Sequence, residues 1–165
     1  GGLSDLAKVS VTNISAGVKM LSVKDIKDYD LHVQVPGTHN VDGDSASITM
    51  ATAIISAFEG VPIDQNLAMT GSLSVRGEVL PIGGVSAKIE AAVKSGIERV
   101  VIPRSNLQDV LIDEKYESMV EIIAVDSLDE VLEHALVGEQ EKISLVERLA
   151  KVIDTFSATS DSTLA

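Results

Sequence analysis

Ser45 and Lys88 have residue types and surroundings that are suited to chemistry. Ser45 lies in a short acidic glycine turn, directly before an apolar run from Ile48 to Phe58 that has the spacing of a helix. Its hydroxyl is therefore expected at a helix N-terminus, where a serine taken alone is most simply a cap. A nucleophilic serine also needs a base within hydrogen-bond reach and donors for an oxyanion, which the first amides of a helix can supply.

Lys88 follows a glycine pair at 83–84 and lies in a segment with the 3.6-residue period of a helix. This period places it at the edge of an apolar stripe formed by Val85, Ile89 and Ala92. Such a lysine either extends its amine to water or loses hydration, and in the second case its pKa falls toward that of a general base. Its pairing with a serine at a helix start favours the second interpretation and predicts a Ser-Lys dyad.

Histidine is the alternative base, and the chain has three: His32, His39 and His134. The order Ser45, Asp129, His134 matches that of the α/β-hydrolases. However, residues 43–47 lack the second glycine of their nucleophile elbow, so a histidine-dependent hydrolase is a weak fit. Each histidine is more simply a solvated or locally bonded side chain.

Composition narrows the classes of fold and partner. The 165 residues predict one domain, and 45% hydrophobic but only 2% aromatic residues predict an aliphatic α/β core. A net charge of −12 repels nucleic acid, and zero cysteines exclude disulfides and thiolate metal sites. The acidic run at 42–44 lacks the glutamate of a calcium loop, so no metal is expected. Without an apolar run of membrane length, we expect a soluble cytoplasmic chain.

Segments with the period of a strand alternate along the chain with segments with the period of a helix, and these elements must position Ser45 and Lys88. Strands are predicted at 31–35, 99–102 and 121–125, with a hairpin between 67 and 81 that turns at Arg76-Gly77. Helices are predicted at 4–21, after Ser45, from Gly84 to Gly96, at 128–136 and at 143–156. The alternation predicts a partly parallel sheet with packed helices, in one domain over 1–156, followed by a disordered tail at 157–165.

Three segments together carry a specific family resemblance. They are Gly43-Asp44-Ser45-Ala46-Ser47, Lys88, and Ala68-Met69-Thr70-Gly71-Ser72-Leu73-Ser74-Val75-Arg76-Gly77-Glu78-Val79-Leu80-Pro81-Ile82-Gly83-Gly84. From about Leu6 to Leu136 the chain resembles the proteolytic domain of the Lon proteases, especially the archaeal type. The resemblance implies that fold, and a serine endopeptidase in which Ser45 is the nucleophile and Lys88 the general base.

The resemblance also implies roles for neighbouring residues. Thr70 orients the lysine amine, and Asp42 matches an acidic position that can pair with the lysine in resting forms. Asp44, directly before the serine, is a further supporting residue. Gly71 and Ser72 match a strand edge where an extended peptide substrate can pair through its backbone.

In the family this domain is the protease part of an ATP-dependent degradation machine. By this resemblance we expect the hairpin that normally begins the domain to be missing before Leu3. We expect the same of the AAA+ ATPase module, which would bind ATP and Mg²⁺ and attach the archaeal type to a membrane. The domain itself needs no cofactor. The resemblance implies unfolded polypeptide substrates and a hexameric ring. The alternative is a non-catalytic Lon-like oligomerisation module of an ATPase, although known inactive relatives lack the Ser-Lys pair that this chain keeps.

Overall fold

The computed structural model describes residues 32–35 and 43–161. Within them the elements follow in the order α2 (Ser47–Glu59), β1 (Leu67–Met69), β2 (Ser72–Leu73), β3 (Val79–Leu80), α3 (Val85–Lys94), β4 (Arg99–Pro103), η2 (Arg104–Asp109), α4 (Glu114–Glu117), β5 (Glu121–Val125), α5 (Leu128–Ala135) and α6 (Glu139–Asp161). The predicted helix at 4–21 lies outside the described residues.

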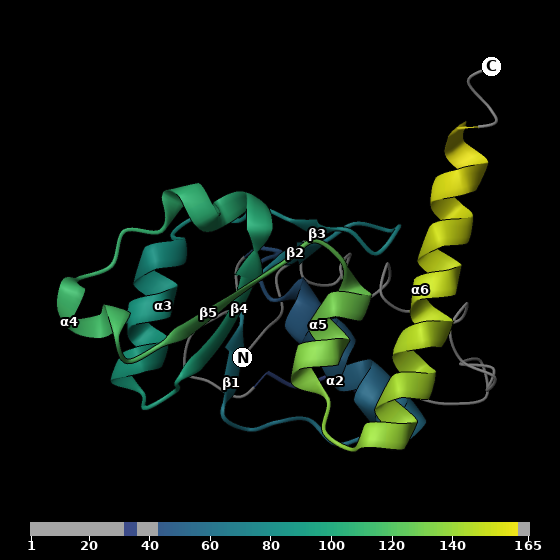
Figure 1. Ribbon diagram of the computed structural model, residues 1–165, viewed down its shortest axis with the longest axis horizontal. Coiled ribbons are helices and arrows are strands. Elements are labelled where there is room, and N and C mark those ends of the chain that lie inside the picture. Colours follow the sequence, from purple (N-terminus) through teal and green to yellow (C-terminus); the bar gives the residue numbers. More distant parts are fainter. Residues whose placement is uncertain (1–31, 36–42, 162–165) are drawn as a thin grey trace.

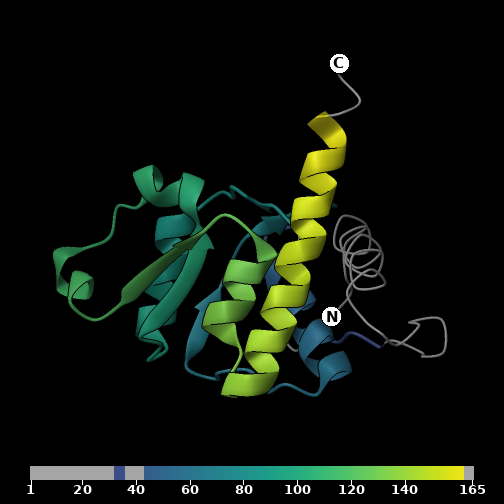
Figure 2. The same cartoon turned by 45° about the vertical axis from the view of Figure 1, so that its right-hand side comes forward.

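A parallel sheet of order β1-β4-β5 forms the middle layer of the fold, which confirms the predicted mixed α/β class (Figure 1). Helix α3 lies on one side of this sheet, and α2, α5 and α6 lie on the other (Figures 1 and 2). Because side chains alternate along a strand, β4 contributes to both sides. Val101 joins the core under α2, α5 and α6, whereas Val100 and Ile102 pack against α3.

The two apolar clusters that result differ in size. The larger contains most of the inward side chains of α2 and α5, including Ile48, Ile55 and Leu132. The smaller contains four buried side chains: Val85, Ile89, Val100 and Ile102. Helix α2 is buried on nearly all faces, as its continuous apolar pattern predicts, and it ends at Gly60 in a left-handed conformation with φ of 72°.

The predicted hairpin is confirmed as a two-stranded antiparallel sheet of β2 and β3, in which Ser72 faces Leu80. Gly77, with φ of 87°, takes the left-handed position of its turn. Residues 67–69 at the start of the predicted hairpin segment instead form β1 of the parallel sheet. The lysine helix, the strands near 99 and 121 and the helix at 128 are also confirmed.

Two predictions at the edges of regular structure are wrong. Residues 32–35 form no strand, although their side chains alternate between exposed and half-buried and Val33 packs on the larger core. Alternation reports burial, whereas a strand also needs a hydrogen-bonding partner. At the other end, α6 continues to Asp161, through the first part of the predicted disordered tail. Once a helix has formed, adding a residue to it is easier than starting one.

Within 32–35 and 43–161, none of the helices combines the length and the apolar character that crossing a bilayer requires.

Candidate active site

Ser45 lies in the turn between Gly43 and α2, half-buried and directly before the helix. Gly43 has a φ of 88°, a conformation that other residues rarely adopt. The N-cap of α2 is Ala46, and no side chain caps the helix there. In the described part of the chain nothing is hydrogen-bonded to the Ser45 hydroxyl. Ser45 is therefore not the helix cap.

The residues after β1 attach the serine turn to the sheet. The carbonyl oxygen of Ser45 accepts hydrogen bonds from the Gly71 amide, at 2.8 Å, and from the Thr70 hydroxyl, at 3.1 Å. The Gly71 carbonyl in turn accepts from the amide of Ile48, at 3.3 Å. The backbone of Gly71 lies close to the side chain of Ile48, because a Cβ atom added to Gly71 would lie 3.0 Å from Cδ1 of Ile48.

Lys88 reaches this junction from the first half of α3. Its Nζ donates to Thr70 Oγ1 at 3.2 Å, and the same hydroxyl donates onward to the Ser45 carbonyl. Thr70 is buried, with 8% of its surface exposed, and its amide donates to the carbonyl of Val101 in β4 at 3.0 Å. Thr70 therefore joins the lysine, the serine turn and the sheet.

The electrostatic surroundings of Lys88 favour its neutral form. Desolvation by burial lowers the pKa of its amine below the ordinary lysine value, and the negative charge of Asp44 partly opposes that shift. No hydrogen bond joins Lys88 directly to Ser45 within the described residues; the two are linked through Thr70. The other predicted partner, Asp42, lies outside the described residues.

Asp44 is held by a side-chain contact that the sequence did not suggest. Ser72 Oγ donates to Asp44 Oδ2 at 2.6 Å, across the gap between β2 and the serine turn. Both backbone groups of Gly71 are hydrogen-bonded to the segment from Ser45 to Ile48, and Ser72 is paired with Leu80 in the hairpin. A role for the backbone of Gly71 and Ser72 in binding a substrate stays a prediction.

The first amides of α2 are also engaged. The Ser47 amide donates to the Asp44 carbonyl at 2.9 Å, and the Ile48 amide donates to Gly71. The Ser47 hydroxyl donates to the same Asp44 carbonyl. Among the described residues, the amides of Ser45 and Ala46 have no hydrogen-bond acceptor, so both are available as donors next to the serine hydroxyl.

The two histidines that the structure describes, His32 and His134, do not join this group. His32 is exposed, His39 lies outside the described residues, and His134 lies half-buried in the last turn of α5. No hydrogen bond connects His134 with Ser45 or Asp129 in the part of the chain that the structure describes.

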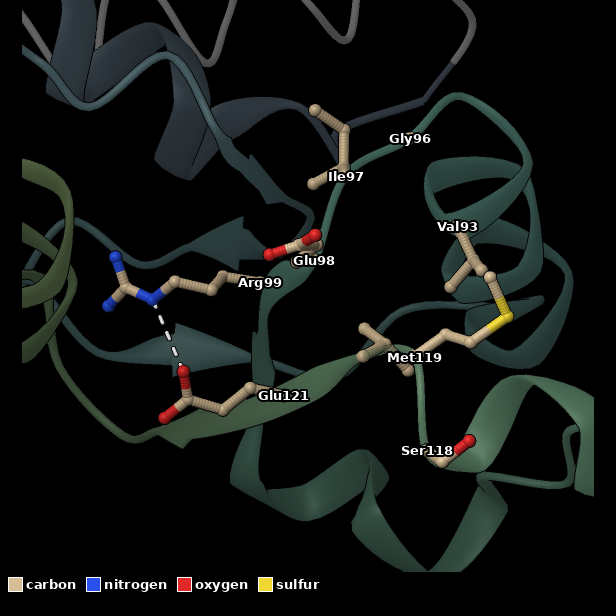
Figure 3. Close-up of a pocket in the computed structure, with 9 residues that line it drawn as sticks. Val93, Gly96, Ile97, Glu98, Arg99, Ser118, Met119 and Glu121 are labelled. Atoms are coloured by element: carbon tan, nitrogen blue, oxygen red, sulfur yellow. Dashed lines mark hydrogen bonds and ion pairs between the residues drawn. The ribbon is translucent and has the colours of Figure 1, made fainter.

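A hollow of about 700 Å³ lies at the opposite edge of the parallel sheet (Figure 3). Arg99 and Glu121, which begin β4 and β5, line it and form an ion pair of 3.3 Å. Thr70 follows the carboxyl end of β1, whereas this hollow lies at the amino ends of the strands. It is therefore separate from the group around Ser45 and Lys88.

The chain is similar over most of its length to known proteins of one family. Residues 3–138 match the family model of the Lon protease (S16) C-terminal proteolytic domain. The chain is 52% identical over 155 residues to the archaeal Lon protease of Methanothermobacter thermautotrophicus, covering 93% of this chain and 24% of that protein. It is 55% identical over 154 residues to the archaeal Lon protease of Halobacterium salinarum, covering 92% and 22%. The Lon protease of Azorhizobium caulinodans is 40% identical over 156 residues, which cover 90% of this chain and 18% of that protein.

Proposed function

Because the chain belongs to the family of Lon protease C-terminal proteolytic domains, we propose that it is a serine endopeptidase that uses Ser45 and Lys88. One observation carries the assignment of these residues. A half-buried lysine with a lowered pKa is hydrogen-bonded to Thr70, whose hydroxyl also holds the carbonyl of a serine with a free side chain. A serine and a partly desolvated amine are the two groups that acyl transfer needs.

The reaction begins when the neutral Lys88 amine takes the proton of the Ser45 hydroxyl as its oxygen attacks the peptide carbonyl. The oxyanion that forms accepts hydrogen bonds from the free amides of Ser45 and Ala46. The protonated lysine gives its proton to the leaving amine, which departs and leaves an ester on Ser45. Water, deprotonated by the same lysine, then hydrolyses this ester and restores both residues.

Three neighbours support the dyad in this proposal. Thr70 keeps the lysine beside the serine turn until the amine moves to the serine oxygen. Asp44, held by Ser72, places a negative charge that stabilises the lysinium formed during attack. Asp42, by family resemblance, pairs with the lysine in a resting state.

The chain spans about a quarter of the length of the curated relatives it matches, 24% and 22% in two of them. We propose that the whole protein joins this domain to an AAA+ ATPase module that binds ATP and Mg²⁺ and delivers unfolded polypeptides. We further propose a hexameric ring in the cytoplasm, attached to a membrane where the ATPase module carries an anchor.

Substitution of single residues tests the dyad. Ser45→Ala and Lys88→Ala should each abolish hydrolysis of a fluorogenic peptide, and the double variant should be no worse than either single one, because the two residues act as a unit. His134→Ala is the matched control and should keep its activity. An active Lys88→Ala variant with inactive Ser45→Ala and His134→Ala variants would favour a histidine-dependent hydrolase, in which Ser45 is still the nucleophile. If the wild-type full-length protein does not hydrolyse the peptide, the alternative of a non-catalytic oligomerisation module is favoured.

A further inference from the structure

Asn106, in η2, is a buried polar residue that the proposed reaction does not use. Only 2% of its surface is exposed. Its Oδ1 accepts from the amide of Ile82 at 2.9 Å, and its Nδ2 donates to the carbonyl of Ile82 at 3.0 Å. Nδ2 also donates to Asp109 Oδ2 at 2.9 Å, which sets the orientation of the amide because a carboxylate can only accept. Both polar atoms of the Asn106 side chain are therefore hydrogen-bonded, to Ile82 in the loop before α3 and to Asp109.

A second link joins the same segment to the first turn of α3. The Ser86 hydroxyl donates to the carbonyl of Asp109 at 3.0 Å and accepts from the amide of Leu111 at 2.8 Å. Segments α3 and η2 lie in contact at the carboxyl end of β4 (Figure 1). Asn106, Asp109 and Ser86, which we call the brace, therefore hold the chain at residue 82 and again at residue 86.

The backbone between these two points has little else to hold it. Gly83 and Gly84 are exposed, and a Cβ atom at either position would meet no atom within 4 Å. Gly84 is the N-cap of α3, with a left-handed φ of 69° and no side-chain cap. The amide of Lys88 donates to the Gly84 carbonyl at 3.2 Å, so the lysine lies one turn beyond this junction. A shift of the glycine pair would move the lysine with it.

We propose that the brace is a positioning device for Lys88, and that Asn106, as its buried centre, sets where the lysine amine meets Thr70. The inference rests on the proposed dyad, and it extends that dyad to a residue 18 positions beyond the lysine. Asn106 acts through the helix and touches neither the serine nor a bound peptide. Two hydrogen bonds to one residue restrict both its position and its orientation, which a single contact would not.

The charged groups near Lys88 give the brace a measurable signature. Asp44 faces the amine from the serine turn, and the brace carries Asp109 behind the start of the helix. Within α3, Glu90 and Lys94 pair with each other at 3.1 Å. If the brace loosens, the amine regains water, the cause of its lowered pKa weakens, and that pKa rises toward the ordinary value.

The decisive experiment measures Lys88 directly in the full-length protein. Competitive acetylation over a range of pH, read by mass spectrometry, gives the midpoint of Lys88, with a lysine model peptide in the same sample as the reference. In the wild type Lys88 should react at lower pH than the model peptide, because burial lowers its pKa. In Asn106→Ala its midpoint should move up toward that of the model peptide. At the same time kcat/KM should fall about 10- to 100-fold, with KM little changed, because a misplaced base slows the chemical step.

Matched variants separate positioning from general destabilisation. Leu149→Ala, in the larger core, should lower the melting temperature while leaving the Lys88 midpoint unchanged. Asn106→Asp places a second carboxylate beside Asp109, so the hydrogen bond between the two side chains is lost. Adding Asp109→Asn to this variant restores an amide donor at position 109 for the carboxylate at position 106. The double variant should therefore recover part of the activity that Asn106→Asp loses.

Unchanged midpoints and unchanged kcat/KM in Asn106→Ala would overturn the proposal. If that variant fails to fold, Ser86→Ala, which removes the half-buried part of the brace, carries the same test with the same two outcomes. A wild-type protein without peptidase activity would refute the proposed function alone, because the acetylation midpoints decide the brace independently.

Discussion

The two sides of the parallel sheet hold the two halves of the proposed dyad in different ways. Ser45 precedes α2, which is packed into the larger core, and backbone hydrogen bonds join its turn to Gly71. Lys88 belongs to α3, whose core contribution is limited to a few side chains such as Val85 and Ile89. Apolar packing and backbone hydrogen bonds hold the proposed nucleophile, whereas side-chain hydrogen bonds hold the proposed base. Damage to the two sides should therefore have different consequences.

The largest effect should come from changing the base itself. Lys88→Arg should be inactive at every pH, because a guanidinium does not lose its proton in this range and cannot accept one from Ser45. The wild type should gain activity as pH rises through a single ionisation below the ordinary lysine value, since burial lowers the pKa of Lys88. A pH–rate profile of peptide hydrolysis measures both. A flat profile would remove the lysine from the mechanism.

The same pKa shift makes stability depend on pH. Burial lowers the pKa of Lys88 in the folded chain, so between that value and the unfolded value, about 10.4, the unfolded chain binds more protons. The free energy of unfolding therefore loses a contribution at neutral pH and regains it as pH rises through this window. Lys88→Met should remove that dependence. Urea unfolding at several alkaline pH values, compared with Lys142→Met as a control, measures the difference.

A smaller loss of activity is expected from a change at Thr70, which joins Lys88 to the serine turn. Thr70→Val keeps the shape of the side chain but removes the acceptor for Lys88 and the donor to the Ser45 carbonyl. We expect kcat to fall about 10- to 100-fold, because the amine loses its orientation. Thr49→Val is the matched control, since its hydroxyl donates to the Met69 carbonyl at the exposed start of α2. Equal kcat values for the two variants would contradict the role of Thr70.

Core substitutions on the two sides of the sheet should differ in their effects on stability and on kcat. Leu132→Ala, in the larger core, should cost about 2 to 5 kcal/mol of unfolding free energy. The folded fraction should nevertheless keep its kcat. Val85→Ala, in the smaller core, should cost only about 1 to 3 kcal/mol but should lower kcat, because α3 carries the base. Active-site titration combined with thermal unfolding separates the two quantities. Similar kcat losses in both variants would remove the distinction.

The smallest change concerns the junction at Gly71. In Gly71→Ala the added methyl would meet Ile48 Cδ1 at 3.0 Å and Val79 Cγ1 at 3.2 Å. Both are ends of side chains that can shift, so we expect a loss of about 1 to 3 kcal/mol in unfolding free energy, measured by urea titration. Combining it with Ile48→Val should recover part of that loss. A fully additive double variant would show that the clash is not the cause.

Local patterns in the sequence were sufficient for the regular elements near the site. The hairpin follows from Arg76-Gly77 between two apolar runs, and the lysine helix follows from the glycines at its ends. Such signals lie within a few residues of the structure they determine. The strand predicted at 31–35 and the tail predicted from 157 failed, because alternation and polar composition do not reveal a pairing partner or the helix that precedes a tail.

The contacts that hold the candidate site were beyond such patterns. Asn106 lies 24 positions from Ile82, and Ser72 lies 28 positions from Asp44. Asparagine in a short polar segment is typical of a surface turn, so nothing local distinguishes a buried one. Ser45 and Lys88 stood out because each was at odds with its surroundings, whereas their supporting residues were not.

The family match and the folded domain end at different residues, and helix α6 lies between these two ends. The family match ends at residue 138, before α6 begins. Yet Leu145 and Leu149 of α6 are buried in the larger core, and Arg148 pairs at 2.8 Å with Glu59, the last residue of α2. A shorter chain that ends with the family match would lack α6, so the apolar residues of α2 and α5 that α6 covers would be exposed and could aggregate. Anyone expressing the domain should therefore choose its end from the packing of α6.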